Sequence, residues 1–379
     1  MPSRLESRTD WYNLKVNLGL PSLVGLRRDE IQTELQNSGL VAEKEARMRA
    51  AQISRWIYQK AAAEFLEMKD VPASLREALA AKFTISPLQV ERHLRSSDDV
   101  DKLLVHRGDG DVYECVLLPY ENRVSCCLSS QVGCPMGCKF CATGIGGFTR
   151  NLDAGEILAQ YLMLQRLSPR RVGHVVFMGM GEPLLNFEAL LKALALLHDE
   201  VGLSYRHITV STVGIVPKIK ELTKTGLPIH LALSLHSPFD RVRDTFMPVN
   251  KRWPVAEVVG AMKDHARKTG RKITIEYLLI DRLTDSLDQA AELAKLVKGT
   301  PSVVNLIPFN YVMTDEGFRR PEVGRVRSFR RELESRGVNV TQRVERGHDI
   351  AAACGQLAGE HQGRFARRES TSALPLASA

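Results

Sequence analysis

The sequence lacks the features of membrane-spanning and secreted proteins. None of its 379 residues stands in an apolar run approaching the roughly 18 residues that cross a bilayer, and its first residues, MPSRLESRTDWYNLK, lack the apolar core of a secretory signal. Aromatic residues are few, at 6%, but hydrophobic residues reach 44% and charged residues 25%, which excludes a disordered or fibrous chain. We therefore expect a folded cytoplasmic protein that does not associate with membranes.

The sequence also lacks an even set of cysteines that could pair as structural disulfides. It has seven cysteines, and without a secretory signal this odd count indicates thiol chemistry. Lys and Arg exceed Asp and Glu by 52 to 44, and the resulting charge of +8 weakly favours polyanionic partners such as nucleic acid. The length predicts two or three domains.

Three cysteines stand close together in GCPMGCKFC, where Cys134, Cys138 and Cys141 form a C-x3-C-x2-C pattern. A structural zinc site is one interpretation, but zinc usually takes four protein ligands, often as two short-spaced pairs, and a second pair is absent. Three thiolates on one short loop suit a 4Fe-4S cluster whose fourth iron remains open to another ligand. This spacing favours a cluster that takes part in chemistry.

Helical periodicity dominates the start of the chain, and alternating strands and helices follow it. We predict helices over 27–40, 43–59 and 74–82, and we interpret the apolar stripe of 49–60 as core packing, with RNA contact as the alternative. KLLVHR and VYECVLLP flank Gly108-Asp109-Gly110 as a hairpin. Six predicted strands, RVSCCLSS, HVVFMG, HITVST, IHLALS, KITIEYLL and VVNLIPF, alternate with helices over 153–167, 187–200, 216–224, 254–268 and 285–297.

These elements predict an α/β fold in which a parallel sheet curves into a partial (β/α)6 barrel. The expected parts are an N-terminal helical accessory domain (1–95) that binds RNA, a β-hairpin linker (96–122), the partial barrel (123–345), a C-terminal segment carrying Cys354 (346–360), and a disordered tail (361–379). Reactive groups gather at the carboxyl ends of strands in such sheets, and the informative motifs follow their strands.

Five motifs, in this order, resemble the radical S-adenosylmethionine RNA methyltransferases of the RlmN/Cfr family. They are CCLSSQVGCPMGCKFCATGIGGFTRNL (126–152), MGMGEPLLN (178–186), LSLH (233–236), NLIPFN (305–310) and RGHDIAAACGQLAG (346–359). The leading segments QISRWIYQK and PASLREAL resemble the same family, so that the likeness covers about residues 23 to 360. The barrel in this resemblance is of the radical SAM type.

The resemblance implies two cofactors, one 4Fe-4S cluster and S-adenosylmethionine. Cys134, Cys138 and Cys141 match the cluster ligands, and one electron from the cluster would cleave S-adenosylmethionine to a 5′-deoxyadenosyl radical. The positions that match the binding site for S-adenosylmethionine are Gly181, Glu182, Ser211, Ser234, Leu235, His236 and Asn310. Turn and capping roles are the structural alternative for Ser211 and Asn310.

The resemblance assigns catalytic roles to Cys354, Cys127 and Glu114. Cys354 matches the cysteine that carries the methyl group, Cys127 the thiol that later forms a disulfide with it, and Glu114 the proposed proton acceptor. The alternatives are a buried cysteine for Cys354 and a solvated strand glutamate for Glu114. Because neighbours on a strand face opposite sides, we expect Cys126 and Cys115 to pack away from the site.

The function implied is methylation of adenine carbon 2 in 23S ribosomal RNA, near the peptidyl-transferase centre, and in transfer RNA at the adenosine 3′ of the anticodon. Methylation of carbon 8, as in the antibiotic-resistance branch, is one alternative, and a non-catalytic zinc-stabilised RNA-binding module is another. We expect an electron donor such as flavodoxin or ferredoxin, a monomer, and phosphate contacts from arginines between 319 and 368. The chain departs from the family pattern at Tyr311-Val312-Met313, which follows NLIPFN, and at STVG (211–214).

Overall fold

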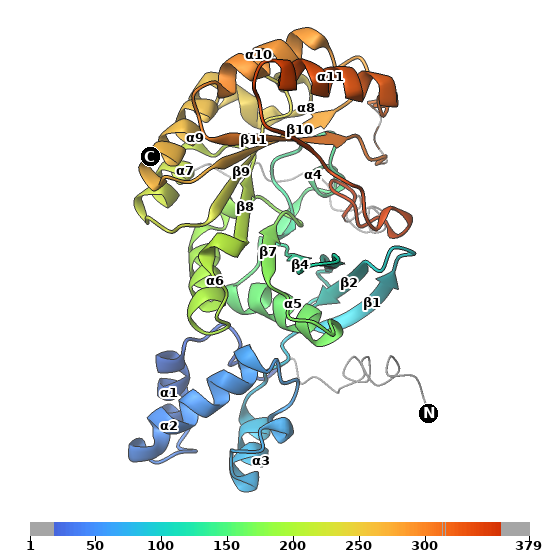
Figure 1. Ribbon diagram of the computed structural model, residues 1–379. Coiled ribbons are helices and arrows are strands. Elements are labelled where there is room, and N and C mark those ends of the chain that lie inside the picture. The colour runs from blue at the N-terminus through green and yellow to red at the C-terminus, as the bar shows by residue number, and fades with distance from the viewer. Residues whose placement is uncertain (1–18, 313, 315, 358–379) are drawn as a thin grey trace.

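The computed structural model describes residues 19–312, 314 and 316–357. The expected tail of 361–379, the start of the N-terminal domain and Met313 lie outside these residues. The described part contains a helical region at the N-terminal end and a large open sheet with helices packed against it (Figure 1).

The N-terminal region is helical, as predicted. It comprises α1 (Arg28–Asn37), α2 (Glu43–Ser54), a π-helical turn (Arg55–Gln59), a 3-10 turn (Phe65–Glu67) and α3 (Ala73–Lys82). Ile53 and Ile57 are fully buried, which supports core packing as the role of the 49–60 stripe. Hydrogen bonds connect the N-terminal region to the helices that pack on the sheet. Lys192 Nζ donates to Glu30 at 2.9 Å, and Arg166 Nε donates to the Ala61 carbonyl at 2.7 Å.

The main sheet has ten strands in the order β1-β2-β3-β4-β7-β8-β9-β10-β11-β12. Their bounds are β1 (Gln89–Arg95), β2 (Asp101–His106), β3 (Tyr113–Pro119), β4 (Val124–Cys127), β7 (His174–Phe177), β8 (Ile208–Thr212), β9 (His230–Ser234), β10 (Ile273–Leu279), β11 (Ser302–Pro308) and β12 (Val340–Gln342). The strands from β4 to β12 run parallel, and the six predicted strands are all among them. The predicted partial barrel is confirmed.

The prediction was incomplete at both edges of this sheet. Residues 89–95, which we placed in the helical region, form β1, because their backbone pairs antiparallel with β2 across a bulge. A seventh parallel strand, β12, pairs with β11. Both edge strands carry polar sequences, QVERHLR and VTQ, in which alternation of apolar residues is weak. The predicted hairpin is present as β2 and β3.

Helices cover the outer face of the parallel strands (Figure 1). They are α5 (Ala154–Leu167), α6 (Phe187–Asp199), α7 (Val216–Lys224), α8 (Asp240–Phe246), α9 (Val255–Thr269), α10 (Leu287–Val297) and α11 (Val323–Ser335). The short α4 (Ala142–Ile145) and a two-stranded ribbon, β5 (Gln131–Gly133) with β6 (Phe148–Asn151), flank the cysteine motif. The inner face is thereby left to line a cavity.

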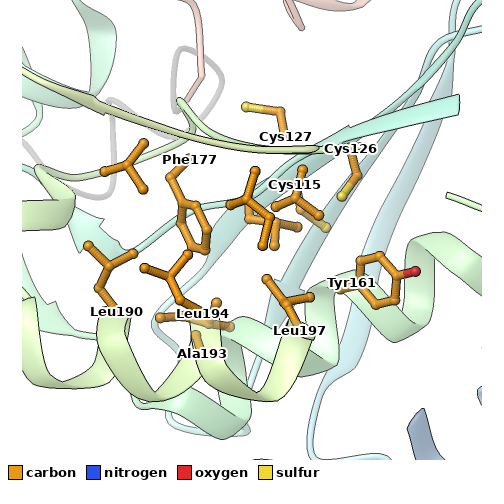
Figure 2. Close-up of a cluster of buried hydrophobic side chains, with 14 of the residues drawn as sticks. Cys115, Cys126, Cys127, Tyr161, Phe177, Leu190, Ala193, Leu194 and Leu197 are labelled. Carbon is orange, nitrogen blue, oxygen red and sulfur yellow. The ribbon is translucent and has the colours of Figure 1, made fainter. Parts of the chain in front are cut away.

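The two adjacent cysteines of β4 face opposite sides of the sheet. Cys126 and Cys115 are fully buried among leucines of α6 and beside Tyr161 of α5, whereas the Cys127 side chain lies on the other side of its strand (Figure 2). This placement agrees with the expected alternation along the strand. Cys127 therefore faces the interior of the partial barrel.

Candidate active site

A large cavity lies at the carboxyl ends of the parallel strands, with an empty volume of about 970 Å³. Sequence-predicted residues that line it are Cys134, Cys138, Cys141, Gly181, Glu182, Ser211, Ser234, His236, Asn310 and Cys354. Leu235 does not line the cavity, since its side chain is fully buried in the core and its amide donates to the Glu276 carbonyl.

The cysteine loop, residues 134–141, is wound tightly beside the ribbon of β5 and β6. Gly133 has φ +74°, and a Cβ there would lie 2.1 Å from the Gly147 oxygen. The Cys134 amide donates to that same oxygen at 2.7 Å, and the Cys141 amide donates to the Cys138 carbonyl at 3.2 Å. Only glycine permits this close approach of two backbones.

The donor set of the loop fits a 4Fe-4S cluster. The thiols of Cys134, Cys138 and Cys141 all line the same cavity. Three thiolates on one loop can each ligate one iron of such a cluster and leave the fourth iron open. Phe140, whose ring packs edge-on against His236 at 4.9 Å, covers this end of the cavity.

Glu182 places a buried carboxylate beside the cysteine loop. Its Oε1 accepts from the Leu184 amide at 3.0 Å and its Oε2 from the Val213 amide at 2.8 Å. Burial raises the pKa of Glu182 to about 7, against the effect of these hydrogen bonds. Gly181 is required for close packing, because a Cβ there would lie 2.6 Å from the Gln131 side chain. A bound ammonium group would favour the ionised form of this carboxylate.

The ends of β8, β9 and β11 supply neutral polar groups to the same cavity. Ser211 and Ser234 lie with their hydroxyl oxygens 3.5 Å apart. Asn310 Nδ2 donates to the Cys354 carbonyl at 3.1 Å, while its buried Oδ1 has no hydrogen-bond partner among the described residues. Burial lowers the pKa of His236 to about 3, so its imidazole is neutral. Such groups can orient hydroxyls of a nucleoside ligand.

A second cavity, with an empty volume of about 570 Å³, adjoins the first. Cys127, Tyr120 and Arg346 line it, and both cavities share Arg343 and Cys354. Cys354, which is partly exposed, therefore stands on the boundary between the two spaces. Burial, with a smaller contribution from the nearby Cys354, raises the pKa of Cys127 to about 12. Cys127 and Cys354 lie far apart in the sequence, and the fold brings both into the wall of the second cavity.

Arg343 is a functional candidate that the sequence predicted only as one of the arginines between 319 and 368 expected to contact phosphates. Its guanidinium carries a positive charge next to Cys354, Glu276 and Cys127, and the interaction with Cys354 is the main cause of its raised pKa. Its Nη1 donates to Met178 Sδ at 3.8 Å. Arg343 follows an edge strand outside every motif, so no local pattern distinguished it from the other arginines.

The C-terminal segment, residues 343–357, is held over the cavity by distant parts of the chain. The Ala142 amide donates to the Gly355 carbonyl at 2.8 Å, and Thr143 Oγ1 donates to the Leu357 carbonyl at 3.0 Å. At its other end, Arg346 Nε donates to Asp98 Oδ2 at 3.0 Å, and the Gly347 amide donates to Asp98 Oδ1 at 3.1 Å. These bonds fix the position of Cys354.

Glu114 lies beneath the C-terminal segment. The glutamate is only 1% exposed, so the alternative of a solvated strand glutamate is wrong. Its carboxylate lies 3.6 Å from the buried Lys102 Nζ, which donates to the Ala351 carbonyl at 3.2 Å. Glu114 shares its strand face with Val116, which lines the second cavity, but does not itself line either cavity.

Several of the arginines that we expected to contact RNA are paired with acidic side chains of the protein itself. On α11, Arg330 Nε donates to Glu334 at 2.7 Å and Arg336 Nε donates to Glu332 at 2.7 Å. Such pairs are typical of a solvated helix face. Arg367 and Arg368 lie outside the described residues.

Among the described helices, we find none with the length and apolar composition that a membrane span requires.

Comparison with known proteins identifies similar chains over nearly the whole length. The sequence signature of the radical SAM superfamily matches residues 128–294, and that of the ribosomal RNA large subunit methyltransferase N-terminal domain matches residues 22–85. The chain is 44% identical over 361 residues to the "Probable dual-specificity RNA methyltransferase RlmN" of Symbiobacterium thermophilum, covering 93% of this chain and 96% of the relative.

Two further relatives support the same likeness. The protein of the same description from Bacillus subtilis is 42% identical, over 89% of this chain and 93% of that one. A crystal structure of a radical SAM methyltransferase from Sphaerobacter thermophilus superposes with a TM-score of 0.85 at 41% identity, covering 89% of this chain and 99% of that chain. The likeness therefore extends to both the sequence and the fold.

Proposed function

Because this chain belongs to the RlmN family of radical S-adenosylmethionine RNA methyltransferases, we propose that it methylates carbon 2 of one adenosine in 23S ribosomal RNA and of the adenosine 3′ of the anticodon in transfer RNAs. Enzymes of the radical SAM superfamily use a 4Fe-4S cluster and S-adenosylmethionine, and these are the cofactors of this protein. Membership of an enzyme family excludes the zinc-stabilised binding module. The position of Cys354 on the boundary of two cavities carries the proposal.

The first cavity would hold both cofactors. Cys134, Cys138 and Cys141 would ligate the cluster, and the Glu182 carboxylate would accept hydrogen bonds from the ammonium group of S-adenosylmethionine. Ser211, Ser234, His236 and Asn310 line the same space and would contact the nucleoside end, with Gly181 allowing the chain to pass closely. Leu235 would contribute only through its backbone, because its side chain lies in the core.

Cys354 would carry the methyl carbon from the first cavity to the second. Its thiol would lose its proton to solvent and take the methyl group of one S-adenosylmethionine, so that a thioether forms and S-adenosylhomocysteine leaves. With both cofactors bound, reductive cleavage of a second S-adenosylmethionine would supply the radical chemistry that removes one hydrogen atom from this S-methyl group. The S-methyl carbon is thereby activated. The activated carbon forms a bond to carbon 2 of an adenine that occupies the second cavity.

Glu114 and Cys127 would complete the reaction. The hydrogen of carbon 2 would leave as a proton, and one electron would return to the oxidised cluster. Glu114, which lies on the same strand face as Val116 in the wall of the second cavity, would accept the proton. Cys127 then attacks the Cys354 sulfur, so that a disulfide forms while the carbon–sulfur bond breaks. The methyl carbon keeps the electron pair of the broken carbon–sulfur bond and takes up a proton. A thiol reductant restores the cysteines, and a flavodoxin or ferredoxin reduces the cluster of the monomeric enzyme.

The experiment compares three cysteine variants of the reconstituted enzyme. We expect Cys354→Ala to bind iron and sulfide normally but to form no methyladenosine. Cys127→Ala should accumulate RNA linked covalently to Cys354, because the resolving thiol is missing. Cys126→Ala is the matched control, since its thiol lies in the core on the other face of the strand, and it should turn over and release RNA. Normal methylation by Cys354→Ala would refute the assignment.

Nucleoside analysis of RNA from cells that express the protein separates carbon 2 from carbon 8. Both products require the same cavities and thiols, so the residues described above do not distinguish them. A methyl group on carbon 8 alone would replace the proposed activity by that of the antibiotic-resistance branch.

A further inference from the structure

Arg243 is a fully buried arginine next to the cofactor cavity. Its side chain reaches from α8 to the ends of two strands, where Nε donates to the Leu235 carbonyl at 3.0 Å and Nη2 donates to the carbonyls of Val213 at 2.7 Å and Ser234 at 3.3 Å. Nη1 donates to Asn250 Oδ1 at 2.7 Å. The arginine therefore ties together the ends of β8 and β9 that face the cavity.

Arg243 forms no direct ion pair with a carboxylate in the described part of the chain. Asp240 and Asp244 lie near enough to attract its charge, but both accept a hydrogen bond from Asn250 Nδ2, at 3.0 and 2.8 Å. Burial lowers the pKa of Arg243 to about 10, which leaves the group cationic at neutral pH. A buried charge without a direct ion pair is costly, so a further anion close to it would stabilise it.

The cysteine loop is a further source of negative charge for Arg243, besides Asp240 and Asp244. The interaction with Cys138 is the foremost influence that opposes the effect of burial on Arg243. The Lys139 amide donates to the Phe246 carbonyl of α8 at 3.0 Å, and Phe246 packs against Cys138 in a small apolar cluster. A cluster held by three thiolates carries net negative charge, and reduction adds to it.

We propose that Arg243 is a positioning residue whose buried positive charge is the counter-ion of the cluster, raises the reduction potential of that cluster, and fixes the strand ends that face S-adenosylmethionine. The inference rests on cluster ligation by Cys134, Cys138 and Cys141, as given under the proposed function. A cation held close to the cluster stabilises the reduced, more negative state over the oxidised state. Removal of its charge should therefore make the cluster harder to reduce.

The test compares Arg243→Gln, which removes the charge but keeps a hydrogen-bond donor, with Arg243→Lys, which keeps the charge but cannot reach all four acceptors. Arg241→Met is the matched control, because Arg241 lies on the same helix but is exposed. Iron and sulfide are measured on each reconstituted full-length protein. The midpoint potential is then measured by redox titration with electron paramagnetic resonance, and the affinity for S-adenosylmethionine by equilibrium dialysis.

We expect the ratio of reduced to oxidised cluster in Arg243→Gln, at a fixed potential, to fall at least about tenfold, a shift of about 59 mV for a one-electron couple. Arg243→Lys should keep the wild-type potential but bind S-adenosylmethionine more weakly, and Arg241→Met should change neither property. An unchanged potential in Arg243→Gln would overturn the proposal. If that variant takes up no cluster, Arg243→Lys decides, since a tenfold change in its ratio would refute the role of charge.

Failure of the proposed function gives a different result. Wild-type protein that bound no cluster, or in which Cys138→Ala still bound a complete cluster, would remove the basis of the proposed function. A wild-type enzyme with its cluster, S-adenosylmethionine cleavage and methylation intact, combined with unchanged potentials in the Arg243 variants, would overturn only the inference about Arg243.

Discussion

The cysteine loop and the C-terminal segment bring thiols to the same cavity, but they are held by contacts of different range. The loop is fixed mainly by neighbours, such as the bond from Cys134 to Gly147. The segment is fixed by Asp98, Asn310 and Ala142, which lie from 44 to 249 positions away along the sequence from their partners. Local contacts can therefore set the positions of the three thiols in the cysteine loop. The position of Cys354, by contrast, depends on elements that are distant along the sequence.

The strongest test of this comparison removes a thiol from the loop. Cys138→Ala should lose the cluster, the cleavage of S-adenosylmethionine and all methylation, because the remaining two thiolates hold a cubane poorly. Cys354→Ala, by contrast, should lose methylation alone. Iron analysis and the yield of 5′-deoxyadenosine distinguish the two variants. Loss of the cluster in both would show that the loop and the segment are not independent.

The local character of the loop can be tested at its glycines. Gly133→Ala should lower the free energy of unfolding by about 3 kcal/mol, because a Cβ at φ +74° would meet the Gly147 oxygen. Gly147→Ala is the control, since its φ is also positive, +80°, but its Cβ would contact nothing within 4 Å. It should cost about 1 to 2 kcal/mol. Equal denaturation midpoints for the two variants would contradict the role assigned to the close approach.

The charge at the C-terminal segment can be tested through Arg343. Arg343→Met should slow the alkylation of Cys354 by iodoacetamide severalfold, because the positive charge that interacts with this sulfur is lost. Arg343→Lys retains the charge and should slow it less. The rates are followed by intact-mass analysis without RNA, so that substrate binding does not contribute. Identical rates in wild type and Arg343→Met would show that this charge does not act on the thiol.

Among these variants, a substitution of Asp98, which anchors the C-terminal segment, should have the smallest effect on activity. Asp98→Asn weakens the bonds to Arg346 and Gly347 and should reduce methylation about threefold to tenfold, while cluster content stays normal. Asp99→Asn is the control, because Asp99 pairs instead with the exposed Arg95. Hydrogen exchange of residues 347–357 measures the loosening directly. A matching loss of activity in both variants would exclude a specific anchor.

The same anchor should depend on pH. Burial opposes ionisation of Asp98, but hydrogen bonds from Ser96, Arg346 and Gly347 outweigh it and hold the pKa of Asp98 below its usual range. The stabilisation is therefore complete above the unfolded-state pKa of about 4 and is lost as the pH falls through the lowered native pKa. Exchange in the wild-type segment should rise toward that of Asp98→Asn on acidification below about pH 4.

The parallel strands were predictable because each is a short run rich in apolar residues and is separated from the next by a periodic helix. HVVFMG, HITVST and IHLALS show this pattern, and all three form strands of the sheet. The edges β1 and β12 were not predictable, since they have few apolar residues and depend on pairing with a neighbouring strand. The different fates of Cys126 and Cys127 followed from the period of two along a strand.

The sequence by itself determined the cysteine loop, because three thiols within eight residues and their glycines act through local geometry. Together with the ordered motifs, it also determined the family and the cofactors. Only the tertiary structure decided that Cys127 and Cys354 share one cavity, that Glu114 is buried beneath the C-terminal segment, and that Arg343 and Arg243 place charge beside the reactive groups. The reason is that burial and electrostatic proximity depend on elements that lie far apart along the chain.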